Sequence, residues 1–184
     1  TTCGSSVDNV SISFSNGIKK VFVTSTTVTG ALGGLTGADA QCQSKASAAG
    51  LGGTYKAWLS TPSVNAINRI PWGVSFVRTD GALVANSETD LTDGSIANPI
   101  SKDENGNSVG SVLVFTGSTG AGVLHTNIYP GYLSAHCDSW TCACTGPNTH
   151  LAGTGSSSST TITWTEFETQ VGYGCSNSFR LYCF

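Results

Sequence analysis

At 184 residues, the chain has the length of a single domain and can bury a sizeable core. It carries 8 Lys and Arg against 11 Asp and Glu, a net charge of −3, and no basic cluster beyond Lys19 and Lys20. Nucleic acids and anionic membranes need a concentrated basic surface, so neither is an expected partner. No apolar run is long enough to cross a bilayer, and we expect no membrane insertion.

The composition is typical of an exported protein. There are 23 glycines and 7 cysteines, and only 10% of the residues are charged. Cysteines at this density favour an oxidising compartment. The glycine, serine and threonine content predicts a loop-rich fold dominated by β-structure. We therefore expect the protein to be secreted or held at the cell surface.

The first predicted elements form a β-hairpin. Residues 11–15 alternate serine with apolar residues, as a half-buried strand does. Asn16-Gly17 is a preferred two-residue hairpin turn, and residues 18–24 return as the second strand.

One main helix is predicted over residues 37–49. Thr36 with Asp39 is a capping-box-like start, because a hydroxyl can accept from an orphan amide and a carboxylate favours the positive helix end. Gly50 stands where a left-handed C-cap is needed. One face carries small residues at helical spacing, which would allow close approach to a sheet: Ala38, Cys42, Ala46 and Ala49.

The rest of the chain predicts short strands joined by loops. Residues 54–59, which include Trp58, alternate like a half-buried strand, and residues 61–70 predict a short helix behind Pro62. Asp80-Gly81 is a second hairpin turn. The other expected strands are residues 76–78, 82–84, 111–116, 162–164 and 178–183, and the expected loops are residues 117–122 and 152–161.

Residues 103–108 resemble part of a calcium loop, because oxygen ligands alternate around a glycine. The candidate ligands in this stretch are Asp103 and Asn105, and Asp90 and Asp93 nearby could contribute further oxygens. Ser108 occupies the position of the EF-hand glycine, and no glutamate stands at the twelfth position. A plain hairpin turn at Asn105-Gly106 is the alternative interpretation, with weak calcium binding left open.

Five soft or imidazole side chains gather in one segment, as a structural zinc site requires. They are His136, Cys137, Cys142, Cys144 and His150. Export favours disulfides at these cysteines, so we expect no zinc. No serine or cysteine stands in a nucleophile motif beside an activating base. We expect a protein that is not an enzyme and holds no cofactor.

The predicted helix and the strand after it carry a family resemblance. The helical part contains three short motifs, Gly37-Ala38-Asp39, Gln41-Cys42 and Ala49-Gly50-Leu51. The strand part begins with Gly53-Thr54 and continues with an aromatic residue, a basic residue, Ala57, a second aromatic residue and Leu59-Ser60. This order resembles endostatin, the C-terminal domain of certain collagens, and the similarity returns at residues 137–140 and 181–183. In character the chain is closest to bacterial endostatin-like surface proteins, such as those of spirochaetes.

The resemblance implies an α+β, C-type-lectin-like fold. Such a fold has a twisted antiparallel sheet with one main helix, long loops and stapling disulfides. It implies one domain over residues 20–184, which leaves residues 1–19 as an N-terminal tail with an extra strand.

Two disulfides are implied by the resemblance, Cys42 with Cys183 and Cys137 with Cys175. The remaining cysteines must be argued from geometry. A bridge across the one residue between Cys142 and Cys144 would be strained, so we expect Cys3 to bond to one of the two. One thiol would then stay unpaired.

The family's known ligands do not carry over to these residues. Heparan sulfate binding by endostatin relies on an arginine array, and this chain has only Arg69, Arg78 and Arg180. The family's zinc site uses N-terminal histidines, which are absent here. Calcium-dependent sugar binding needs an acidic or amide residue before the Pro147 turn, where Gly146 stands.

An aromatic surface is the candidate binding face. It would comprise Trp140, Tyr129, Tyr132 and Asn148. Core packing is the alternative role for these aromatic residues.

Two functions follow as expectations. The first is an exported, non-enzymatic binding module, adhesin-like, for an extracellular matrix protein or glycan. The alternative is a structural subunit that self-assembles into an extracellular filament or surface layer. An unpaired cysteine and a low-charge, strand-rich surface suit subunit contacts.

Overall fold

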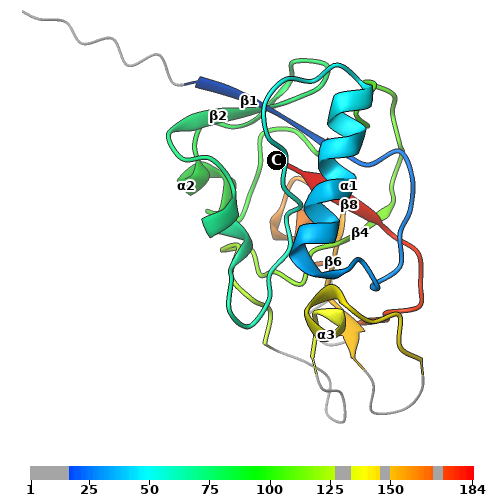
Figure 1. Ribbon diagram of the computed structural model, residues 1–184. Coiled ribbons are helices and arrows are strands. Elements are labelled where there is room, and N and C mark those ends of the chain that lie inside the picture. The colour runs from blue at the N-terminus through cyan, green and yellow to red at the C-terminus, as the bar shows by residue number, and fades with distance from the viewer. Residues whose placement is uncertain (1–16, 127–133, 146–149, 168–171) are drawn as a thin grey trace, which may run out of the picture.

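A computed structural model describes residues 17–126, 134–145, 150–167 and 172–184 of a mixed α and β protein (Figure 1). The strands are β1 (Gly17–Val23), β2 (Val74–Arg78), β3 (Leu83–Ala85), β4 (Leu113–Phe115), β5 (Leu151–Ala152), β6 (Thr154–Ser156), β7 (Tyr173–Gly174) and β8 (Arg180–Cys183). The helices are α1 (Gly34–Ala48), α2 (Glu88–Leu91), α3 (Cys137–Trp140) and the 3-10 helices η1 (Ala66–Arg69) and η2 (Ile162–Trp164).

Six strands form a curled sheet in the order β3-β2-β1-β8-β4-β6. The sheet is mixed: β1 with β8, β2 with β3 and β4 with β6 pair antiparallel as expected, whereas β1 with β2 and β4 with β8 pair in parallel. A parallel pair needs a long crossover between its strands. The chain between β1 and β2 contains α1 and η1, and a long loop-rich segment separates β4 from β8.

The central strands are buried on both faces. In β1, Val21 and Val23 pack into one core and Phe22 packs into another. In β8, Tyr182 points to the first core and Leu181 to the second. Because successive strand residues point to opposite faces, the sheet separates two apolar cores.

Helix α1 covers one face of the sheet, lying across β8 and β4 (Figure 1). It buries the small side chains Ala38, Cys42 and Ala46, so the helix lies close to the strands as predicted. The Sγ atoms of Cys42 and Cys183 lie within bonding distance, with 5.4 Å between the Cα atoms. The pairing implied by the resemblance therefore joins α1 to β8.

The opposite face carries a cluster of large aromatic side chains. Trp58 lies 5.3 Å, centroid to centroid, from both Trp164 and Phe184. The indole Nε1 of Trp58 donates to Thr165 Oγ1 over 2.8 Å. The polar atom of this buried tryptophan is therefore satisfied without water.

The two ends of α1 differ in how well the sequence predicted them. Gly33, not Thr36, is the N-cap residue, and no side chain caps the helix there. The C-terminal end is as predicted, with Gly50 in the left-handed region at φ 69°. The N–H groups of Gly50 and Leu51 bond to the carbonyls of Ser47 and Ala46, which is a Schellman motif.

Several other predicted elements are confirmed with shifted ends. β1 lies where a strand was expected over residues 18–24, with both ends one residue earlier. The predicted hairpin of β2 and β3 turns through Gly81, whose φ is 88°. β4, β8 and the short helix η1 lie where strands and a helix were predicted. The expected strand over residues 11–15 and its turn residue Asn16 lie outside the described residues.

Three local predictions are wrong. Residues 162–164 form η2 instead of a strand, and residues 154–156, predicted as loop, form β6. The lack of a side chain at Gly155 lets β6 lie directly against the end of η2, because a Cβ at that position would lie 1.9 Å from the Trp164 carbonyl oxygen. Residues 54–59 form no regular strand, and only Ala57 makes a β-bridge, with Cys183.

No helix in the described ranges is long and apolar enough to cross a membrane.

The expected boundary between residues 19 and 20 falls inside β1, where Gly17 to Val21 all pair with β2.

Gly50→Ala tests the helix end. The new Cβ would meet no atom within 4 Å, so its cost comes only from the left-handed backbone. We expect the free energy of unfolding to fall by about 1 kcal/mol. Gly52→Ala is the matched control, because it also meets no atom and has no left-handed φ. Urea unfolding of both variants measures the difference, and equal effects would contradict the motif.

Candidate functional site: a groove between β1, η1 and the end of β8

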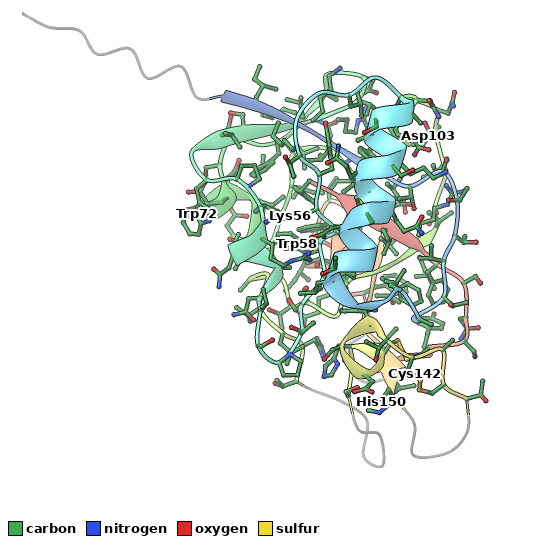
Figure 2. All side chains as sticks on the ribbon, in the orientation of Figure 1. Lys56, Trp58, Trp72, Asp103, Cys142 and His150 are labelled. Atoms are coloured by element: carbon green, nitrogen blue, oxygen red, sulfur yellow. A yellow bond between two sulfur atoms is a disulfide. The ribbon has the colours of Figure 1, made fainter. Side chains whose placement is uncertain are left out.

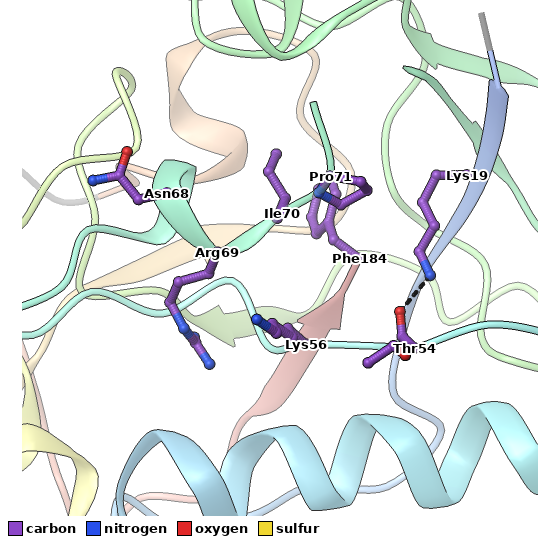
Figure 3. A pocket seen from close by; sticks show the side chains of 8 residues that line it. All are labelled: Lys19, Thr54, Lys56, Asn68, Arg69, Ile70, Pro71 and Phe184. Carbon is purple, nitrogen blue, oxygen red and sulfur yellow. Dashed lines mark hydrogen bonds between the residues drawn. The ribbon is translucent and has the colours of Figure 1, made fainter. Parts of the chain in front are cut away.

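A groove of about 520 Å³ opens where β1 and the end of β8 diverge (Figure 3). Its walls come from β1, the segment paired with β8, η1 and the residues that follow η1. The lining residues are Lys19, Thr54, Lys56, Asn68, Arg69, Ile70, Pro71 and Phe184. Three of the chain's 8 basic residues thus meet in one groove that no acidic residue lines.

Backbone pairing fixes the position of Lys56. Its N–H donates to Phe184 O over 2.8 Å, and the Phe184 N–H donates back to Lys56 O over 2.9 Å. The buried neighbours Tyr55 and Ala57 turn inward, so Lys56 faces outward and is exposed. Its side chain makes no ion pair or hydrogen bond in the described part of the chain.

Lys19 spans the groove from the opposite wall. Its Nζ donates to Thr54 O over 2.6 Å and lies 3.4 Å from the centroid of the Tyr55 ring. Burial disfavours the charged ammonium, which lowers the pKa of Lys19 from 10.5 to about 8. The amine is still protonated at neutral pH, and the ring face stabilises that charge.

Arg69, in the wall formed by η1, holds neighbouring segments of the fold together. Its guanidinium donates to the carbonyls of Ala57 and Leu59 and forms an ion pair with Asp39 of α1. Asp39 Oδ1 also accepts the Ala57 N–H over 3.0 Å. This clamp holds η1, α1 and the chain beside β8 together, so Arg69 is largely neutralised.

The floor of the groove and one part of its rim are apolar. Ile70 and Phe184 are buried beneath it, and Pro71 is exposed at its edge. The next residue, Trp72, is 62% exposed and points away from the body of the molecule (Figure 2). The Gly73 N–H donates to Glu88 Oε2 over 3.1 Å, which anchors the turn that carries Trp72.

A second groove of about 280 Å³ lies on the other side of Lys19. It is lined by Ile18, Lys19, Lys20, Gly50, Leu51, Gly52 and Tyr55. Ile18 is 72% exposed there. Lys19 therefore stands between two adjoining grooves, with a large exposed apolar side chain beside each.

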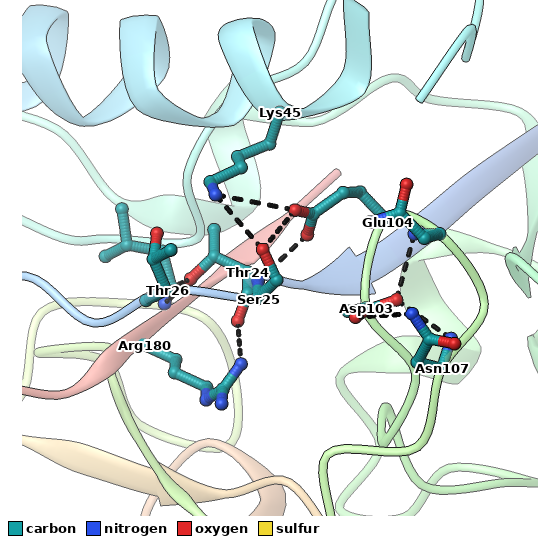
Figure 4. A network of polar contacts seen from close by, with 10 residues as sticks. Thr24, Ser25, Thr26, Lys45, Asp103, Glu104, Asn107 and Arg180 are labelled. Atoms are coloured by element: carbon teal, nitrogen blue, oxygen red, sulfur yellow. Dashed lines mark hydrogen bonds and ion pairs between the residues drawn. The ribbon is translucent and has the colours of Figure 1, made fainter. Parts of the chain in front are cut away.

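The carboxylates predicted as calcium ligands accept hydrogen bonds from their own loops, and Figure 4 shows this for Asp103. Asp103 is buried, and its Oδ1 accepts the N–H groups of Asn105 and Asn107 over 2.9 and 2.8 Å. Asp90 and Asp93 accept from backbone N–H groups of their own turns. Among the described residues, no three His, Cys, Asp or Glu side chains are placed to hold a metal ion.

The neighbouring Glu104 serves the fold as well. Its carboxylate is buried, accepts the Ser25 N–H over 2.9 Å and lies 3.6 Å from Lys45 Nζ. Lys45 in turn donates to Ser25 Oγ over 3.0 Å (Figure 4). The acidic loop therefore fastens α1 to the end of β1.

The expected aromatic binding face is wrong for the one member that the structure describes. Trp140 is fully buried, packs against Phe115 and donates its Nε1–H to Ser60 O over 2.9 Å. Tyr129, Tyr132 and Asn148 lie outside the described residues. Trp140 is a core residue because its indole bridges the core beneath α1 to the Ser60 backbone.

The turn that carries Trp140 is left-handed. Cys137, Asp138, Ser139 and Trp140 have φ values of 47°, 51°, 56° and 66°, which non-glycine residues rarely adopt. Burial of Trp140 and the contact between the sulfurs of Cys137 and Cys175 hold this conformation. Desolvation lowers the pKa of His136, which fits an imidazole whose Nδ1 accepts the Ser139 N–H over 2.8 Å.

The remaining cysteines differ from the prediction. Cys142 and Cys144 lie with their sulfurs in contact and their Cα atoms 5.2 Å apart, whereas a bridge from Cys3 to one of them was expected. The backbone through Ala143 brings the two Cα atoms into the range that disulfides use, so one intervening residue does not prevent the bridge. Cys3 itself lies outside the described residues.

Sequence reasoning missed the groove because its cations are far apart in the chain. Lys19, Lys56 and Arg69 share no window, and only folding brings them together. The alternation around Lys56 indicated an exposed side chain, but nothing indicated its neighbours. The one signal in the sequence was a tryptophan, Trp72, directly after a proline.

No protein-family model matches the chain, and no curated protein is similar to it in sequence.

Asp39→Ala tests the clamp beside the groove. The change leaves the Ala57 N–H without its acceptor and the nearly buried Arg69 guanidinium without its carboxylate partner. We expect a loss of about 2 kcal/mol in the free energy of unfolding. Asp80→Ala is the control, because it removes a more exposed ion pair with Arg78 and a longer hydrogen bond, 3.3 Å, from the Ala82 N–H, and it should cost less than about 1 kcal/mol. Denaturant titration followed by tryptophan fluorescence distinguishes the two, and equal losses would contradict the role of Asp39.

Proposed function

We propose that the protein is an exported, non-enzymatic binding module, adhesin-like, with an endostatin-like and C-type-lectin-like fold. The observation that carries this proposal is the groove beside Lys19. Its free cation Lys56 and the exposed Trp72 do nothing for the fold in the described part of the chain. Exposed charged and aromatic side chains without a packing role mark binding surfaces.

The chemistry of the groove favours a ligand that is anionic and partly apolar. Lys56 and Lys19 supply positive charge at the mouth, Asn68 supplies an exposed amide, and Pro71 supplies apolar surface at the edge. The exposed Trp72 follows Pro71 in the chain and adds apolar surface outside the lining of the groove. A carboxylate or similar anion on an extracellular protein or glycan would meet all three kinds of group. The protein as a whole has a net charge of −3, so its overall charge does not attract an anionic ligand. The attraction comes from the lysines of the groove alone.

The secreted or cell-surface location is part of the same proposal. The paired cysteines and the sparse charge both support an extracellular setting. Within that setting, the groove is open to solvent, and its volume of about 520 Å³ can hold a side chain or a sugar ring.

A structural subunit remains the second candidate, favoured by one observation. Ile18 is 72% exposed on β1, next to the second groove, and a large apolar side chain in that position suits a contact between copies of the chain. In that case the native protein would form filaments or layers.

Lys56→Glu tests the binding proposal. Wild-type protein immobilised on a sensor surface is screened against extracellular matrix proteins and glycans, and the best ligand is then measured with the variant. We expect affinity to fall at least about tenfold, because the mouth of the groove loses a cation and gains an anion. Lys102→Glu is the control with the same change of charge outside the groove, and it should bind within about threefold of wild type.

Two results would overturn the proposal. One is the absence of saturable binding to any member of the panel. The other is an equal effect of both substitutions, which would indicate a general effect of charge. Filaments seen by electron microscopy of a wild-type protein that binds nothing would favour the structural subunit.

Lys19 gives a prediction for pH. With a pKa of about 8 in the folded protein against 10.5 for an ordinary lysine, the folded chain loses this proton first. Between the two values the unfolded chain binds more protons, so the contribution of Lys19 to stability rises with pH across that window. Competitive acetylation of the folded protein should give Lys19 a midpoint near 8. The same residue in denaturant is the control, and one shared midpoint would contradict the burial.

A further inference from the structure

The three cysteine pairs differ in how far apart in the chain the segments are that they join. Cys42 and Cys183 are 141 residues apart and join α1 to β8, and Cys137 and Cys175 are 38 residues apart and join α3 to the chain after β7. Cys142 and Cys144 are 2 residues apart and join one short loop to itself. A disulfide stabilises a fold mainly by closing a loop, and the effect grows with loop length. The third pair therefore does least for stability.

Exposure separates the pairs in the same way. All four sulfur-bearing residues of the two long-range pairs are fully buried. Cys142 and Cys144 are only partly buried, and their neighbours Thr141, Ala143 and Thr145 are exposed. A thiol in solution can approach the third pair without any opening of the core.

The surrounding contacts hold the loop without help from its own disulfide. The N–H groups of Thr141 and Cys142 donate to Cys137 O over 3.1 and 3.2 Å. The Cys142 carbonyl packs closely on Gly30, where a Cβ would lie 2.7 Å from that oxygen. Opening the third disulfide would therefore leave Thr141 and Cys142 in place.

We infer that Cys142 and Cys144 form a thiol–disulfide exchange site whose substrates are accessible thiols of extracellular molecules. A substrate thiolate attacks one sulfur, a new S–S bond forms, and the Cys142–Cys144 bond breaks. The displaced sulfur leaves as a thiolate and takes up a proton. A second substrate thiolate then attacks the mixed disulfide, which releases an oxidised substrate disulfide and leaves the protein as a dithiol. Two electrons pass from the substrate thiols to the protein.

The spacing of the pair controls the intermediate. The freed thiol stays one residue from the mixed disulfide, so it can attack that bond and expel the substrate unchanged. The site therefore binds thiols covalently but reversibly. Capture becomes lasting only where the substrate is held by further contacts or where the second cysteine is removed.

Reduced glutathione is the probe for a direct test. Oxidised full-length chain is equilibrated with graded glutathione redox buffers without denaturant, free thiols are alkylated, and peptides are mapped by mass spectrometry. We expect Cys142 and Cys144 to be alkylated at reduced glutathione concentrations at least about tenfold below those that open the other pairs. The near-ultraviolet circular dichroism should stay unchanged at that stage.

Two variants complete the experiment. Cys144→Ser leaves Cys142 without its resolving neighbour, so oxidised glutathione should give a stable mixed disulfide at Cys142. Cys142→Ser combined with Cys144→Ser should keep the fold and abolish glutathione uptake at this loop. The same double substitution at Cys137 and Cys175 is the structural control and should destabilise the core.

Three results would overturn the inference. They are a Cys3 bridge to Cys142 or Cys144 in the oxidised chain, simultaneous opening of all pairs together with loss of the dichroism signal, and a Cys144→Ser variant that forms no mixed disulfide.

Discussion

Strand β8 is the element on which the rest of the structure depends. It is hydrogen-bonded to β1 on one edge, and on the other it meets β4 and then the chain at residues 56–58. Its side chains fill both apolar cores, and Cys183 lies against Cys42 of α1. A strand that is held on both edges and both faces cannot move alone, so the helix, the sheet and the long loops share one constraint.

The groove is a consequence of that constraint. β8 ends at Cys183, and Phe184 continues the pairing with Lys56, while β1 follows β2 away from that line. Because the two strands diverge, a wedge-shaped groove opens between them. Phe184 lies at its floor, and the Lys19 side chain reaches across it to Thr54 O. Asp39 and Arg69 fix the third wall by tying α1 to η1. The rigid parts of the fold thus position the proposed binding residues, and little reorganisation would be needed to bind a ligand.

Local chemistry explains which parts of the fold the sequence predicted well. The Gly50 helix end and the Gly81 hairpin turn need a positive φ that glycine adopts readily, so a single residue marks them. The small face of α1 follows from residue spacing alone. The predicted N-cap failed because the helix begins at Gly34, two residues before Thr36, and Asp39 accepts from Ala57 and Arg69 instead. A capping pattern cannot reveal that a distant backbone will compete for the same carboxylate.

By itself, the sequence determined the helix with its narrow face and the main turns. Each rests on contacts between residues close in the chain. The tertiary structure alone decided the parallel strand pairs, the burial of Trp140 and the meeting of Lys19, Lys56 and Arg69. The physical reason is that these features depend on which segments pack together, and packing is set by the two cores around β8. The proposed binding site and the partly exposed Cys142–Cys144 pair both lie where that packing ends.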